Sequence, residues 1–100
     1  MQPDLKNFVD KIFSINESYG SAFGAAPSGG GGKAATDLIN SLRLSTGQFA
    51  EILNLHASKE GLDKLAQAIE GDLLNLQVIG HISQKFCDEL VDQLHTLKNR

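Results

Sequence analysis

Two histidines and two aspartates near the carboxyl end of the chain have the residue types and the spacing to be considered first as cation ligands. They are His81, Asp88, Asp92 and His95. On a helix, steps of seven, four and three residues place all four side chains on one face. Two histidines that share a metal on one helix stand four residues apart, whereas His81 and His95 would be about 21 Å apart at 1.5 Å per residue. We therefore expect no metal site and interpret this face as solvated.

The single cysteine, Cys87, could act as a nucleophile only beside a base. It falls at the edge of an apolar helical sector, and His81 and His95 fall on the opposite side. The spacing predicts a packed, unreactive thiol. One cysteine also excludes an intrachain disulfide and a Cys-rich zinc module. No other grouping of Ser, His and an acid emerges, so we expect neither an enzyme nor a bound cofactor.

A glycine-rich stretch, residues 20–33, ends in Lys33 and could suggest a phosphate-binding loop. The P-loop motif requires Gly five residues before its final Gly, and Ser or Thr after the Lys. Pro27 and Ala34 occupy these places. The composition instead predicts a flexible linker, natural or engineered, with a root-mean-square span of about 20 Å.

The segment 46–69 resembles the helix-turn-helix unit of repressor-type DNA-binding proteins, over a quarter of the chain. Such a unit has apolar residues around a small one in its first helix, then a residue that tolerates a left-handed backbone. The matching residues are Phe49, Ala50, Leu53, Asn54 and Leu55. Counted onward from this turn, the two inward positions of the second helix fall on Glu60 and Asp63, which are charged where the motif has apolar residues. A turn longer by two residues would place Leu62 and Leu65 there instead.

The resemblance implies that exposed residues of the second helix, Lys59, Lys64 and Gln67, would contact DNA. DNA-binding domains usually carry clustered Lys and Arg, because phosphate neutralisation supplies much of the affinity. The formal charge here is zero over residues 1–33 and −1 in each of 34–57, 58–70 and 71–100. Nucleic acid is therefore the alternative partner and not the favoured one.

The elements that must position these residues are helices, because apolar residues recur at steps of three and four and never alternate over six residues. The pattern predicts an all-α, compact bundle of four to five helices. We expect helices at about 4–19, 34–43, 46–55, 59–70 and 72–98, with the flexible linker at 20–33. Ser45 and Gln48 form a capping-box pattern that would start the third helix. Gly71 would end the fourth, and Asp72 would cap a long last helix.

Length and composition indicate one soluble domain. The 100 residues are 41% hydrophobic and 21% charged, with a formal net charge of −3, which is enough apolar material for one core and no more. The chain has neither a secretory signal pattern nor an apolar run that could span a membrane. We expect a cytoplasmic protein.

The predicted last helix has an apolar sector about 180° wide, more than one neighbouring helix covers. This width favours a small protein–protein interaction module, such as an adaptor, a chaperone or a regulatory subunit, that associates with itself or with another protein. We expect the contact at Leu90, Leu94 and Leu97, where the helix would extend beyond the helices that cover it. A membrane or a small-molecule substrate is not indicated.

Overall fold

Helices account for nearly all of the chain in the parts that the computed structural model describes, which are residues 2–15, 32–55 and 59–99. The elements are α1 (Pro3–Ser14), α3 (Gly32–Asn54), a short 3₁₀ turn η1 (Lys59–Gly61), α4 (Leu62–Val78) and α5 (Gln84–Lys98). The described residues contain no strand. The all-α prediction is thus confirmed. The predicted linker at 20–33 lies outside the described residues, except that α3 already begins at Gly32.

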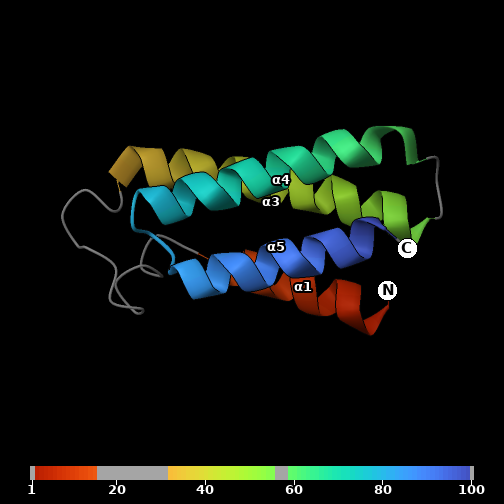
Figure 1. The fold of residues 1–100 in the computed structure, drawn as a ribbon. Helices are drawn as coiled ribbons and strands as arrows, with labels where there is room; N and C mark the ends of the chain where they lie inside the picture. The colour runs from red at the N-terminus through yellow and green to blue at the C-terminus, as the bar shows by residue number, and fades with distance from the viewer. Residues whose placement is uncertain (1, 16–31, 56–58, 100) are drawn as a thin grey trace.

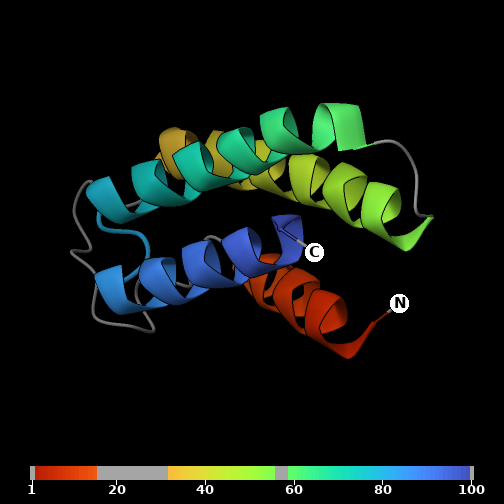
Figure 2. The same cartoon turned by 45° about the vertical axis from the view of Figure 1, so that its right-hand side comes forward.

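The four α-helices of the described residues form two layers of antiparallel pairs (Figures 1 and 2). α3 packs along α4 in one layer, and α5 lies beside α1 in the other. α4 also packs on α5, and α1 on α3, so the helices close a ring around one core. The molecule measures 42 × 22 × 16 Å along its principal axes. No described helix combines the length and the apolar composition that crossing a membrane would require.

The core is built from the apolar stripes of all four helices. Its largest fully buried side chains are Phe8, Ile12, Ile15, Leu42, Phe49, Leu62, Ile69, Leu73, Leu76, Ile82, Leu90 and Leu94. Phe8 of α1 and Phe49 of α3 meet edge to face, with ring centroids 6.4 Å apart. Such aromatic pairs add about 0.5–1.5 kcal/mol beyond the area that they bury. This contact fixes where α1 lies along α3.

α3 is one continuous helix, so the prediction of two helices at 34–43 and 46–55 is wrong, although α3 ends at Asn54, one residue before the predicted end. The inward stripe runs without interruption at steps of four and three residues, through Ala35, Ile39, Leu42, Thr46, Phe49 and Leu53. Thr46 is fully buried and continues this stripe. Its polarity hides the continuity in the sequence, because Ser45 and Thr46 together resemble a helix start.

The prediction of one long helix over 72–98 is wrong, because two helices, α4 and α5, share these residues. α4 runs through Gly71 and Asp72 to Val78. A glycine inside a helix costs only about 0.5–1 kcal/mol relative to alanine, and the stripe of Leu62, Ala66, Ile69, Leu73 and Leu76 crosses Gly71 without a gap. Packing of that stripe outweighs the cost of Gly71.

The true break lies at Gly80, whose φ of 79° is left-handed. The Gly80 N–H donates to the Gln77 carbonyl at 3.0 Å, and the His81 N–H donates to the Leu76 carbonyl at 2.9 Å. This pair of bonds is the Schellman motif that ends a helix. Ser83 then caps α5, since its hydroxyl accepts the Phe86 N–H at 3.1 Å. The turn folds α5 back along α4 and seats Ile82, 2% exposed, in the core.

α1 ends at Ser14, earlier than the predicted end at residue 19. Ile15 is extended and fully buried, and residues 16–19 lie outside the described part of the chain. A guanidinium nitrogen of Arg43 on α3 donates to the Ile15 carbonyl at 2.8 Å and to the Phe13 carbonyl at 3.5 Å. A cation from another helix therefore caps the carboxyl end of α1, which is a favourable place for positive charge.

Candidate interaction surface

The three leucines predicted to contact a partner lie inside this chain. Leu90 and Leu94 are fully buried, and Leu97 is 2% exposed. α4 and α1 both pack on α5 and divide its apolar sector between them. The expectation that these leucines extend beyond their covering helices is therefore wrong, and an interaction surface has to be sought elsewhere.

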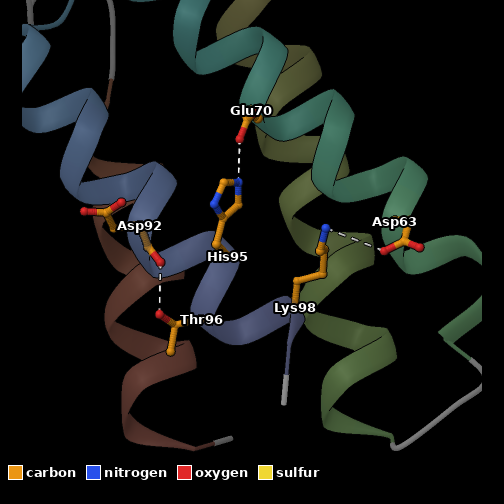
Figure 3. Close-up of polar contacts among 6 residues, drawn as sticks. All are labelled: Asp63, Glu70, Asp92, His95, Thr96 and Lys98. Carbon is orange, nitrogen blue, oxygen red and sulfur yellow. Dashed lines mark hydrogen bonds and ion pairs between the residues drawn. The ribbon is translucent and has the colours of Figure 1, made fainter.

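The polar face predicted for the last helix is only partly exposed. Asp88, Asp92 and His95 face solvent on α5, but His81 is 2% exposed, because the Schellman turn carries it inward. Across α4 and α5, His95 Nε2 lies 2.6 Å from Glu70 Oε1 (Figure 3). Within the described ranges, no group of three or more His, Cys, Asp or Glu side chains is placed to hold a metal ion.

A second contact joins the same two helices near their ends. Lys98 Nζ lies 3.8 Å from Asp63 Oδ1 (Figure 3). Exposed ion pairs of this kind contribute about 0–1 kcal/mol each. Together with the His95–Glu70 contact, this pair aligns α4 with α5 at the surface. These side chains thus stabilise the register of the two helices.

Cys87 is fully buried on α5. Burial raises the pKa of its thiol, and the negative charges of Asp88 and Glu70 raise that pKa further. Because the thiolate is the reactive form, both effects suppress its reactivity. The structure thus places Cys87 where the sequence predicted, as a packed side chain.

The helix pair at the predicted helix-turn-helix unit has a different geometry from that motif. α3 and α4 run antiparallel and side by side (Figures 1 and 2), whereas the two helices of a helix-turn-helix cross at about 90–120°. Lys64 and Gln67 are exposed on α4. Lys59 belongs to η1, and its side chain lies outside the described part. The arrangement provides no projecting recognition helix.

The outer surface of the α3–α4 layer differs chemically from that of the α1–α5 layer. Between residues 40 and 48 of α3, the exposed residues are Asn40, Ser41, Leu44, Gly47 and Gln48. Between residues 67 and 78 of α4, they are Gln67, Ala68, Leu74, Asn75 and Val78. None of these carries a charge, and the exposed charged residues of the two helices, Asp37, Glu51, Asp63 and Lys64, lie outside these stretches. The exposed residues of α1 and α5, by contrast, include Asp4, Lys6, Asp10, Lys85, Asp88, Glu89 and Asp92. Depletion of charge is a property of interface centres.

Four large apolar residues are exposed on the α3–α4 layer: Leu44 and Leu55 on α3 or next to its end, and Leu74 and Val78 on α4. Leu44 is 66% exposed and Leu55 is 65% exposed. With Gln48 and Glu51 they form a row that we call the α3 ridge. The steps of four, three and four residues place the four side chains within about 60° of one another at 100° per residue. The ridge lies opposite the inward stripe of the same helix.

An open groove of about 380 Å³ borders the ridge, between α3 and the first turns of α4. Its lining residues are Gln48, Glu51, Ile52, Leu55 and Leu65. Ile52 and Leu65 are half-buried and pack against the core, so their remaining apolar surface forms the floor. Gln48 and Glu51 lie at the wall. The groove thus combines an apolar floor with few polar groups, as helix-binding grooves do.

The junction of α3 and α4 also holds a half-buried carboxyl group, that of Asp72. Burial raises its pKa, and a hydrogen bond from the Ser41 hydroxyl partly offsets the increase. Its Oδ2 atom is buried and has no hydrogen-bond partner among the described residues. Burial at this junction thus disfavours the charged form of Asp72.

Comparison with known proteins adds no functional information: a scan against protein-family models gave no match, and neither did searches of curated proteins and of solved structures.

Proposed function

We propose that this chain is a non-enzymatic protein–protein interaction module that binds a helical partner along the α3 ridge and its groove. The observation that supports the proposal is the joint exposure of Leu44 and Leu55 on one helical face, beside the apolar floor of Ile52 and Leu65. Single exposed leucines are common on protein surfaces. Two on one ridge, bordering a groove whose lining holds one charged residue, Glu51, match a surface that another helix covers.

The chemistry of the groove selects the kind of partner. An amphipathic helix can place apolar side chains three and four residues apart into such a groove. Covering one leucine side chain contributes about 1.5–3 kcal/mol. A partner that relies on these contacts should remain bound at high salt, because apolar contacts are not screened as charge contacts are.

Capture from lysate of the native host, with nuclease present and at two salt concentrations, tests this function. Three immobilised proteins are compared: the unchanged chain, Leu55→Glu and Val78→Glu. Val78 is 77% exposed and, like Leu55, lies near the carboxyl end of a helix, but it lies outside the ridge and groove. We expect the unchanged chain and Val78→Glu to retain a partner at both salt concentrations. We expect Leu55→Glu to lose it. Equal capture by all three would overturn the proposal.

A further inference from the structure

We infer that the helical partner of the α3 ridge is α3 of a second copy of this chain, packed antiparallel across a twofold axis at Gln48. The inference rests on the proposed function and names its partner. A twofold interface requires one surface that carries both a projection and the recess that receives it. The α3 ridge and its groove lie side by side on one surface and meet this requirement.

The spacing of large and small residues is self-complementary about Gln48. Leu44 and Ile52 lie four residues to either side, so antiparallel packing sets the exposed Leu44 of each copy over the groove residue Ile52 of the other. Ser41 and Leu55 lie seven residues to either side, which pairs a small side chain with a large one. Each of these pairs lies about 6 or 10 Å from the axis at 1.5 Å per residue.

The outward residues of α3 also follow the repeat of a coiled-coil seam. Ser41, Leu44, Gln48, Glu51 and Leu55 recur at steps of three and four and are all exposed. Two helices with this repeat pack along each other at a shallow angle. Because the seam contains only two leucines, we expect a dimer that dissociates on dilution.

The polar groups of the ridge are compatible with a second copy. The two Gln48 side chains meet at the axis, and each amide offers both donors and an acceptor to the other. Glu51 lies opposite Ser45, at an equal distance on the other side of Gln48, so it faces a hydroxyl and not its own copy. Glu51 is the one exposed charged residue between 41 and 55. Its two copies lie on opposite sides of the axis, about 9 Å apart along the helices at 1.5 Å per residue, so the two carboxylates do not face each other.

The contact is small for a dimer. An axis at Gln48 pairs residues 41–55 of the two copies, which is about 21 Å of helix at 1.5 Å per residue. A contact of this length that is roughly 20 Å across covers on the order of 400 Å² per partner, whereas a standard interface covers about 800 Å² per partner. The area therefore fits a weak dimer, and Val78, at the far end of α4, lies outside the contact.

Sedimentation velocity over a range of concentrations tests the dimer, with the unchanged chain, Leu44→Glu, Leu55→Glu and Val78→Glu. The unchanged chain and Val78→Glu should shift toward twice the 10.8 kDa monomer mass as concentration rises. Each ridge variant should weaken the dimer about 100-fold or more, because the change occurs twice in a symmetric interface. Circular dichroism checks that the variants keep their helix content.

Oxidative cross-linking tests the position of the axis. Gln48→Cys should form a covalent dimer readily, whereas Val78→Cys should not, and the buried native Cys87 gives little background. A monomer at every concentration would overturn the second copy as partner. If the ridge-dependent capture described above still succeeded, only this inference would fail. A dimer that neither ridge variant weakens would overturn the inference by placing the contact elsewhere.

Discussion

Asp72 is the residue at which the fold opposes ionisation. Its carboxyl group is half-buried where α3 meets α4, and burial raises its pKa above the ordinary 3.8, while the Ser41 hydroxyl lowers it by a smaller amount. The folded state therefore binds the proton more tightly than the unfolded state does. Stability from this group is fully present below the unfolded pKa and is lost as the pH rises through the folded pKa.

Replacing Asp72 by Asn should therefore raise the free energy of unfolding at pH 7, because the neutral amide keeps an acceptor for Ser41 and removes the buried charge. The gain should shrink as the pH falls toward the unfolded pKa, since both proteins are then neutral at this position. Urea denaturation at pH 7 and near pH 4 measures the difference. Asp92→Asn, on the exposed face of α5, is the control. A variant less stable than the unchanged chain at pH 7 would contradict this account.

Gly71 and Gly80 show that the effect of a glycine on a helix depends on its position. Gly71 lies inside α4, and a Cβ added there would meet no atom within 4 Å. Gly80, at the end of the same helix, has a φ of 79° that an L side chain adopts only with strain. The same residue type thus weakens a helix at one position and ends it at the other.

Alanine at the two positions should have opposite effects. Gly71→Ala should raise the free energy of unfolding by about 0.5–1 kcal/mol, by lowering the entropy of the unfolded chain. Gly80→Ala should lower it by about 1–2 kcal/mol, through strain in the left-handed turn. Chemical denaturation followed by circular dichroism measures both. If Gly71→Ala were the more damaging change, α4 would have to end near residue 71 after all.

The whole molecule depends on a core that all four described helices share. Leu94 of α5 is fully buried in it, whereas Leu44 of α3 is 66% exposed. An unpaired charge in the interior costs several kcal/mol, which is comparable with the total stability of a small domain, about 5–15 kcal/mol. A charge at the surface carries no such cost.

Leu94→Asp should therefore unfold much or all of the chain, while Leu44→Asp should keep its helix content. Far-ultraviolet circular dichroism and thermal melting distinguish the two outcomes. Normal helix content in Leu94→Asp, together with loss of self-association, would instead support the contact predicted at the end of the last helix. The pair of variants thus separates core from interface by two measurements.

The sequence by itself determined the helical class and most of the inward stripes. Apolar residues spaced three or four positions apart are a local property of the chain, which can be read without the tertiary structure. The inward positions of Phe49 and Leu62 are predictable for this reason, whereas Leu90, expected at a partner contact, is core. The burial of Cys87 followed from the same periodicity. The helix breaks were less predictable, because Gly71, Ser45 and Asp72 are breakers or caps only where packing does not continue across them.

Only the tertiary structure decided which faces stay exposed. α1 and α4 together cover the wide sector of α5, so Leu94 became core, and the turn at Gly80 carried His81 inward. Leu44 lay between two expected helices and became part of a ridge only when α3 proved continuous through Thr46. Periodicity tells which residues of one helix share a face. The neighbours that cover that face come from distant parts of the chain, and their packing decides what remains for a partner.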